Sequence, residues 1–286
     1  MRLLITGGKG QLGSSLREIL ESRGDHESKF IDIDELDITE RHSVEDFFSE
    51  NSFDILINCA AYTAVDKAET ERSLATAVNV SAIENLATAA KKYGFRVIHI
   101  STDYVFDGKS HIPYKETDQP NPRTVYGKTK LEGERMLQSI LPDSIIIRTA
   151  WLYSLYGRNF FLTMKGKALR REEARVVDDQ IGTPTYAPDL AAAIMKIIDS
   201  DNWEAGIFHF SNEGKTTWFD FTRRIYELYG LPESLVSPIK SSELKNAAPR
   251  PAYSLLDKSK ISSVYDIKIP GWEESLKRAV EKAQGR

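Results

Sequence analysis

Short apolar runs alternate with amphipathic segments through the first half of the chain. We predict strands at residues 3–5, 30–32, 55–58, 97–100 and 145–147. Between them, apolar positions recur at helical spacing over residues 14–23, 43–50, 75–93 and 124–140. Continuously apolar strands separated by helices are typical of a parallel sheet that is covered on both faces. The pattern therefore predicts a Rossmann-type, doubly wound α/β fold.

The pattern changes after about residue 151. Apolar runs at 176–177 and 206–210 stand among helical segments at 160–170, 189–198, 218–229 and 272–283. We predict a dinucleotide-binding domain over residues 1–150 and a smaller, mixed α/β substrate-binding lobe over most of residues 151–286. The segment 186–199 is so strongly apolar that we expect its helix to pack back on the first domain.

Charge and hydropathy exclude several classes of function. The 38 basic and 42 acidic residues give a formal net charge of −4, which argues against bulk binding to nucleic acid or anionic lipid. No run approaches the roughly 20 apolar residues that span a bilayer. The apolar start of the chain is also too short for a signal peptide. We therefore expect a cytoplasmic protein with no nucleic-acid partner and no membrane partner.

The single cysteine adds little chemistry. Cys59 ends an apolar run and has no second cysteine with which to form an intrachain disulfide. Since free cysteine is often buried, we interpret Cys59 as a small core residue.

A glycine-rich loop follows the first predicted strand and opens the first predicted helix. Gly7, Gly10 and Gly13 are evenly spaced, which differs from the familiar G-x-G-x-x-G arrangement. Three glycines alone would also fit a flexible turn. The strand before them and the helix after them favour a loop that brings the backbone and a helix N-terminus close to a pyrophosphate.

Asp32 ends the second predicted strand, at the distance from Gly13 where many dinucleotide-binding proteins carry an acidic residue. Its carboxylate would accept hydrogen bonds from the ribose hydroxyls and repel a 2′-phosphate. This favours NADH as the cofactor, with NADPH possible. The alternative is a solvated aspartate, because Asp34, Glu35 and Asp37 crowd the same loop.

Tyr126 and Lys130 stand four positions apart in a predicted helix and so share one face of it. A nearby ammonium group favours the phenolate and is expected to lower the pKa of Tyr126, which could then donate a proton to a carbonyl oxygen. Such a pair on an exposed helix face would be unremarkable. However, Thr102 follows the strand at 97–100 and Trp151 follows the strand at 145–147, so several strand ends converge on one cleft.

These motifs together resemble the extended short-chain dehydrogenase/reductases. The segments 59–69, 101–108, 126–134, 148–153 and 179–185 closely resemble the dTDP-4-dehydrorhamnose reductase family, and the resemblance covers essentially the whole chain. It implies transfer of a hydride from the nicotinamide to the C4 ketone of dTDP-4-dehydro-L-rhamnose, which gives dTDP-L-rhamnose. Tyr126 would donate the proton, Lys130 would also bind the nicotinamide ribose, and Thr102 would orient the carbonyl.

The same resemblance implies the composition of two subsites. The cofactor would contact Gly10, Gln11, Leu12, Asp32, Asp37, Ile38, Ala60, Ala61 and Tyr62, besides the catalytic residues. The sugar nucleotide would contact Val65, Asp103, Tyr104 and Trp151. Asn79 matches a helix asparagine that supports the site in many relatives, although it could equally be an ordinary polar helix residue.

Two further features concern ligands and partners. Arg250 lies between two prolines, so we expect a stiff loop whose guanidinium closes over the substrate diphosphate; a solvated arginine is the alternative.

Some family members are thought to dimerise through a magnesium ion held by glutamates. Here the corresponding positions carry Ser14, Ser15 and Pro188, none of which offers a carboxylate. We predict no such metal site and leave the choice between monomer and homodimer open.

Two other functions compete with this interpretation. One is a nucleotide-sugar epimerase or dehydratase, but the Thr102–Asp103 pair is followed by Tyr104, whereas a dehydratase would have a glutamate there. The other is a non-catalytic regulatory subunit resembling that of methionine adenosyltransferase, because a fold and its motifs do not prove turnover.

Overall fold

A computed structural model describes residues 1–244 and 248–285. Its central feature is a sheet of six strands in which every neighbouring pair is parallel. Across the sheet the order is β10 (Gly206–Phe210), β5 (Ile145–Thr149), β4 (Arg96–Thr102), β3 (Ile55–Asn58), β1 (Arg2–Thr6) and β2 (Glu27–Ile31). The order reverses direction at β1, which is the topology of a doubly wound sheet.

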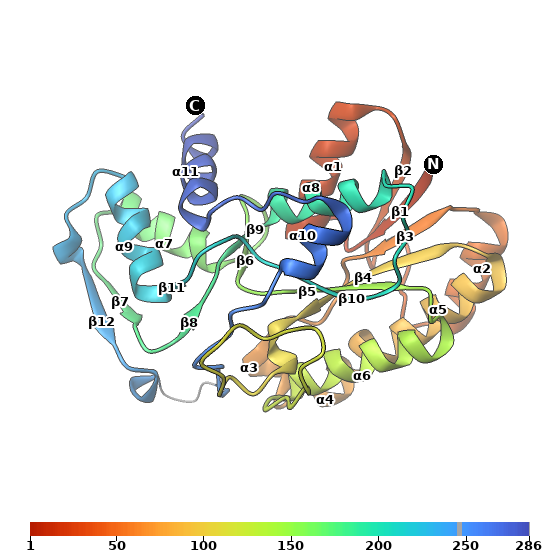
Figure 1. The fold of residues 1–286 in the computed structure, drawn as a ribbon, viewed down its shortest axis with the longest axis horizontal. Helices are drawn as coiled ribbons and strands as arrows, with labels where there is room; N and C mark the ends of the chain where they lie inside the picture. Colours follow the sequence, from red (N-terminus) through yellow and green to blue (C-terminus); the bar gives the residue numbers. More distant parts are fainter. Residues whose placement is uncertain (245–247, 286) are drawn as a thin grey trace.

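Helices cover both faces of this sheet (Figure 1). One face carries α1 (Gln11–Arg23), α8 (Ala187–Ile198) and α10 (Ser259–Tyr265). The other face carries α2 (Arg41–Glu50), α5 (Ala82–Tyr93) and α6 (Val125–Ile140). Successive strand residues such as Leu3 and Leu4 enter opposite cores, because side chains alternate along a strand. The predicted Rossmann-type fold is confirmed. None of the helices within the described ranges is long and apolar enough to cross a membrane.

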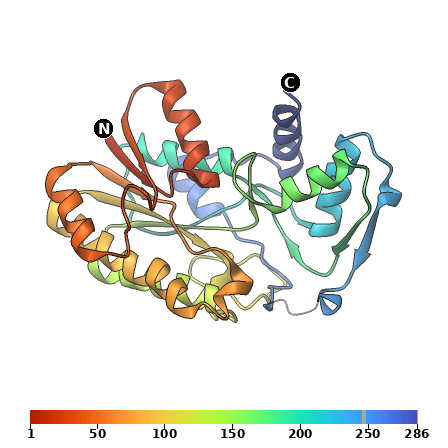
Figure 2. The ribbon, with the colours of Figure 1, turned by 180° about the vertical axis from the view of Figure 1, so that it is seen from behind.

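A smaller lobe lies beside the carboxyl ends of the sheet strands, at the end of the molecule away from α2 (Figures 1 and 2). Its core is formed by α7 (Phe160–Leu169), α9 (Trp218–Leu228), α11 (Trp272–Ala283) and the parallel strands β7 (Ala174–Val177) and β12 (Val236–Ile239). Two more strand pairs join β6 (Leu152–Tyr153) to β9 (Thr185–Tyr186) and β8 (Ile181–Gly182) to β11 (Thr216–Thr217).

The chain returns to the sheet after it has entered the lobe. The segment 206–210, which the pattern placed with the lobe, is β10 and pairs with β5 at the sheet edge. Its Phe208 and Phe210 are buried against α8 and α10. The position of this strand depends on a pairing partner some sixty positions earlier, so local periodicity could not assign it.

The helix predicted over residues 75–93 is interrupted. The structure forms α4 (Arg72–Thr76), one π-helical turn η1 (Ala77–Ser81) and then α5. A π turn inserts an extra residue into a helix and is frequent at functional sites. Asn79 lies in this turn, and its side chain bonds to the Tyr62 backbone in the loop after β3.

Candidate active site

A cavity of about 1190 Å³ opens where the sheet meets the smaller lobe. Nineteen different residues were predicted for the catalytic, cofactor and substrate sites, and all but one of them line it. Those that do are Gly7, Gly10, Gln11, Leu12, Gly13, Asp32, Asp37, Ile38, Ala60, Ala61, Val65, Thr102, Asp103, Tyr104, Tyr126, Lys130, Trp151 and Arg250. Tyr62 is the exception, since its hydroxyl donates to Glu71 Oε2 at 2.7 Å on the exposed side of the loop.

The glycine loop has the geometry of a phosphate cradle. Gly7 has φ +64°, and a Cβ on Gly13 would overlap the Gly7 carbonyl oxygen. Helix α1 begins at Gln11, with Gly10 at its N-cap, no side-chain cap and no acidic residue in its first turn. Its first N–H groups are therefore available to a negatively charged ligand. These residues fit a dinucleotide pyrophosphate.

Asp32 is held in place directly after β2. Its carboxylate accepts the backbone N–H groups of Lys9 at 3.1 Å and Ile33 at 3.0 Å, and it lines the cavity. The Lys9 ammonium lies nearby, paired with Asp34 and 3.8 Å from Glu35. The loop therefore presents a fixed carboxylate to the cavity with one lysine at its side.

Tyr126 and Thr102 lie together on the cavity wall. Thr124 caps α6 by accepting the Gly127 N–H at 3.0 Å, which fixes the turn that carries Tyr126. Burial raises the pKa of Tyr126 to about 12, although a hydrogen bond from the Thr102 hydroxyl lowers it. The expected lowering of this pKa by Lys130 is therefore wrong: burial and the nearby Asp103 raise the pKa of Tyr126, and Lys130 is not among the groups that shift it.

The reason is visible in the contacts of Lys130. Its Nζ donates to the Ile100 carbonyl at 2.7 Å and lies 3.3 Å from Nε2 of His99. The side chain is 2% exposed, and burial lowers its pKa to about 8 while Glu134 raises it. Lys130 is thus at the cavity, as predicted, but its amino group is shared with a buried histidine that the sequence did not single out.

The remaining predicted substrate residues form the wall toward the smaller lobe. Burial raises the pKa of Asp103 to about 6, and one of its carboxylate oxygens has no hydrogen-bond partner. Trp151 adopts φ 49°, a conformation that is uncommon for a large side chain. Its ring stacks on Trp218 at 3.8 Å with an interplanar angle of 13°. This aromatic pair joins the two parts of the molecule across the cavity.

Arg250 lines the cavity but already has a partner. Its two terminal nitrogens bind the two carboxylate oxygens of Asp66 at 2.6 and 2.7 Å. The Ala248 N–H also donates to Asp66 Oδ1 at 2.8 Å. The Arg250 guanidinium therefore lies in the cavity wall, where a forked ion pair holds it to Asp66 of the short helix α3 (Val65–Ala68).

Two other predictions are refined by the structure. Asn79 bridges the Tyr62 N–H, the Tyr62 carbonyl and the Thr129 hydroxyl at 2.9–3.2 Å, so it fixes the loop after β3 against α6. Gly133 makes this approach possible, because a Cβ there would overlap the Asn79 carbonyl oxygen.

Cys59 is partly exposed and lines the cavity rather than lying fully in the core, and burial raises the pKa of its thiol.

Sequence reasoning missed much of the wall supplied by the lobe. Further lining residues include Arg158, Asn159, Phe160, Met164, Arg175, Val177, Gln180 and Trp218. Only Asn159 carried a local signal, since it caps α7 with its side chain. The others reach the cavity through tertiary packing.

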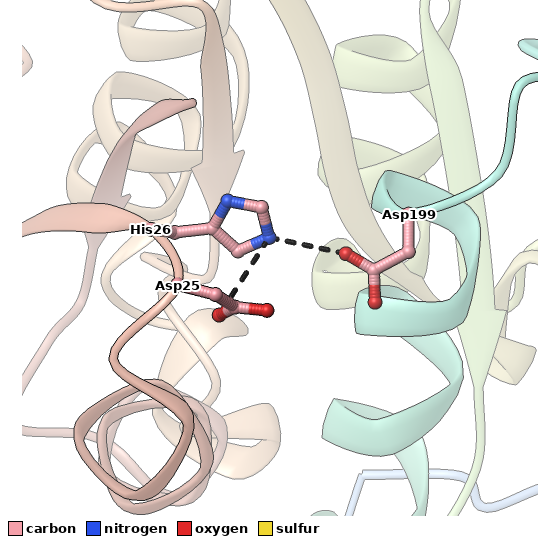
Figure 3. A group of neighbouring side chains, drawn as sticks. All are labelled: Asp25, His26 and Asp199. Atoms are coloured by element: carbon pink, nitrogen blue, oxygen red, sulfur yellow. Dashed lines mark hydrogen bonds and ion pairs between the residues drawn. The ribbon is translucent and has the colours of Figure 1, made fainter.

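One side-chain cluster has the composition of a metal site. Asp25, His26 and Asp199 lie close together, with His26 Nε2 3.0 Å from Asp199 Oδ1 (Figure 3). Arg23 also binds both carboxylates, so both already have a cationic partner. The cluster precedes β2, at the opposite end of that strand from Asp32 and the cavity. We therefore assign it a structural role between β2 and α8.

The chain matches the family model described as "RmlD substrate binding domain" over residues 1–284. A dTDP-4-dehydrorhamnose reductase of Aggregatibacter actinomycetemcomitans is 43% identical, with 96% of this chain and 97% of that protein covered. The crystal structure of a dTDP-4-dehydrorhamnose reductase from Clostridium acetobutylicum is 40% identical, with a TM-score of 0.93 and coverage of 99% and 100%. The Bacillus anthracis reductase in complex with NADP is 38% identical, with a TM-score of 0.93 and coverage of 98% and 99%.

Proposed function

The chain belongs to the RmlD substrate binding domain family, and on that premise we propose that it reduces the C4 ketone of dTDP-4-dehydro-L-rhamnose to give dTDP-L-rhamnose. It is an oxidoreductase of nucleotide-sugar biosynthesis that uses NAD(P)H. The observation that carries the proposal for this chain is the meeting of Thr102, Tyr126 and Lys130 with the glycine loop at one cavity.

The side chains divide the reaction between them. Reduced nicotinamide supplies the hydride when bound. The Thr102 hydroxyl orients the ketone, and Tyr126 gives its O–H proton to the ketone oxygen. A proton donor must be within hydrogen-bond reach of its acceptor, which the shared wall of Thr102 and Tyr126 allows. Lys130 stands behind Tyr126 as a source of positive charge and as a donor to the nicotinamide ribose.

An assay of NADH and NADPH oxidation with dTDP-4-dehydrorhamnose tests this function directly. We expect turnover with the dTDP sugar and weaker activity with its UDP and GDP analogues. Stabilisation of a partner enzyme without any turnover would instead support a regulatory subunit. We propose that the protein works in the cytoplasm as a monomer or homodimer. Its partner is the nucleotide sugar.

We further propose that Asp32 makes NADH the preferred cofactor. The fixed carboxylate would accept the ribose hydroxyls and repel a 2′-phosphate. Substituting Asp32→Ser should raise kcat/KM for NADPH relative to NADH by roughly tenfold, about 1.4 kcal/mol. The neighbouring Asp34→Ser variant is the matched control, because its carboxylate pairs with Lys9 and it should change the ratio little. Equal efficiency with both cofactors in the wild type would contradict the assignment.

Arg250 is proposed to bind the substrate diphosphate by exchanging Asp66 for phosphate oxygens. Because guanidinium matches both partners with paired hydrogen bonds, the exchange preserves its donor geometry. Arg250→Ala should raise KM for the nucleotide sugar by roughly tenfold or more and leave cofactor affinity unchanged. Asp66→Asn weakens the competing ion pair and should leave KM unchanged or lower it. Equal increases in both variants would mean that the ion pair, and not the diphosphate, is the function of Arg250.

A further inference from the structure

A row of buried polar side chains crosses the face of the sheet that packs on α6. Thr6, Asn58 and His99 are paired in register across β1, β3 and β4, and each is only 1% exposed. The corresponding row two residues earlier is apolar, with Leu4, Leu56 and Val97. Buried polar groups are costly unless they are hydrogen-bonded, so this change in character calls for a set of partners.

The orientation of the Asn58 amide is fixed by the backbone. The Ala60 N–H donates to Asn58 Oδ1 at 3.2 Å, and the Thr6 hydroxyl donates to the same oxygen at 2.6 Å. A backbone N–H can only donate, so the atom that faces Ala60 must be the amide oxygen. The amide NH₂ then faces Nδ1 of His99 at 3.0 Å and donates to it.

This orientation fixes the tautomer of His99. Burial and the nearby Lys130 hold the pKa of His99 well below its usual value, so the ring is neutral. Nδ1 accepts a hydrogen bond and carries no proton, so the single ring proton is on Nε2. That nitrogen lies 3.3 Å from Lys130 Nζ. An ammonium group has no lone pair, and Nε2–H can therefore donate only to the uncharged amine.

We propose that His99 is a positioning residue of the reductase, held by Asn58 in the Nε2–H tautomer so that it receives the Lys130 amine and sets the protonation equilibrium of that lysine. The inference rests on the proposed function, in which Lys130 supports Tyr126. His99 does not line the cavity and acts through Lys130.

Lys130 replaces the proton that Tyr126 gives to the ketone. When Tyr126 has given its O–H proton to the ketone oxygen, one N–H bond of the Lys130 ammonium breaks and the tyrosine O–H bond forms again. With the pKa of Tyr126 near 12 and that of Lys130 near 8, this transfer is favourable. The resulting amine accepts the Nε2–H of His99, and water returns the missing proton before the next turnover.

The other ionisable groups around Lys130 are accounted for. Glu134 stands one turn further along α6, but Arg148 and Ser101 both donate to its carboxylate. Cys59, from the end of β3, keeps its thiol proton because burial raises its pKa. Asp103 faces Thr102 and Tyr126 after β4. Of these groups, His99 is the one within hydrogen-bond distance of Nζ.

The tautomer can be measured in the wild-type protein. Nitrogen NMR of protein labelled at its five histidines should show one ring with a protonated Nε2 and an unprotonated Nδ1 throughout the pH range of activity. That signal should disappear in His99→Leu, which assigns it. A signal for the Nδ1–H tautomer or for a charged ring would overturn the proposal. This measurement requires no turnover, so its outcome is separate from that of the activity assay.

Two variants test the link to Lys130 through the pH profile of kcat/KM. Activity should fall as Lys130 loses its charge, near pH 8 in the wild type. Asn58→Asp places a carboxylate where the amide was, which moves the ring proton to Nδ1 and lets Nε2 accept from the ammonium. The fall of kcat/KM at high pH, the basic limb of the profile, should then move to higher pH by about one unit or more. This is a tenfold change in the acid dissociation constant of Lys130. His99→Leu should move the basic limb in the same direction, because the competing donor is lost.

Thr6→Val is the matched control in the same row. It removes one buried hydroxyl but leaves the Ala60 N–H to orient Asn58, so stability should fall and the basic limb should stay in place. A limb that stays in place in Asn58→Asp and His99→Leu, or moves downward, would reduce His99 to a structural residue. If either buried variant fails to fold, the wild-type tautomer decides the question alone.

Discussion

Replacing Tyr126 with phenylalanine is expected to lower kcat by roughly 10²–10⁴-fold, the usual contribution of a positioned general acid. The ring and its packing against Tyr104 would remain, so the cavity wall should keep its shape. Binding of NADH, measured by fluorescence titration, should be unchanged because the glycine loop and Asp32 are untouched. The kcat is best measured under single-turnover conditions, so that product release does not hide the chemical step.

The neighbouring variants should follow a definite order. Lys130→Met should lower both kcat and cofactor affinity, because it removes a charge behind Tyr126 and a ribose donor together. Thr102→Val should lose less activity if its hydroxyl only orients the ketone. The order matters more than the sizes, since residues that act as a unit are not additive. Near-normal turnover in Tyr126→Phe would defeat the mechanism and favour a regulatory role.

Arg148→Met, away from the cavity, is expected to lower the free energy of unfolding by about 3–5 kcal/mol. Arg148 forms two hydrogen bonds with Glu134, at 2.9 and 2.7 Å, and the two side chains are only 2% and 1% exposed. Removing the arginine leaves a buried, uncompensated carboxylate. Urea denaturation followed by circular dichroism measures the change.

Two comparisons separate this effect from the general loss of a charge. Arg170→Met breaks an exposed pair with Glu172, whose side chains are 61% and 44% exposed, and should cost at most about 1 kcal/mol. Adding Glu134→Leu to Arg148→Met should recover much of the lost stability, because no unpaired charge then remains. A loss below about 1 kcal/mol in Arg148→Met alone would show that solvent or a neighbour already compensates Glu134.

Local sequence signals predicted those parts of the molecule that local geometry controls. Strand and helix periods predicted five of the six sheet strands, and the fixed four-residue spacing of a helix put Tyr126 and Lys130 on one face. The glycine loop and Asp32 were recognisable because a strand and a helix N-terminus frame them. Each of these relations is set within a short stretch of chain, so the sequence around it contains the necessary information.

The features that were missed depend on residues far apart in the chain. Asp66 and Arg250 are separated by 184 positions, and no pattern in either loop indicates the other. The sign of the Tyr126 pKa shift was wrong for a similar reason. Charge pairing along a helix can be read from spacing, whereas the depth of burial is known only once the lobe, the sheet and α6 are assembled.

The return of the chain to the sheet edge also limits how this protein can be divided. A fragment ending near residue 150 would lack β10, α8 and α10, and would expose the β5 edge and the part of one apolar sheet face that α8 and α10 cover beside α1. Conversely, a fragment beginning there would contain β10 without its partner strand β5, and α8 and α10 without the sheet on which they pack. The nucleotide-binding part and the lobe are interleaved along the gene, so neither can be exchanged between relatives by a single crossover. Recombination that respects this architecture needs several junctions, placed where the chain passes from one part to the other.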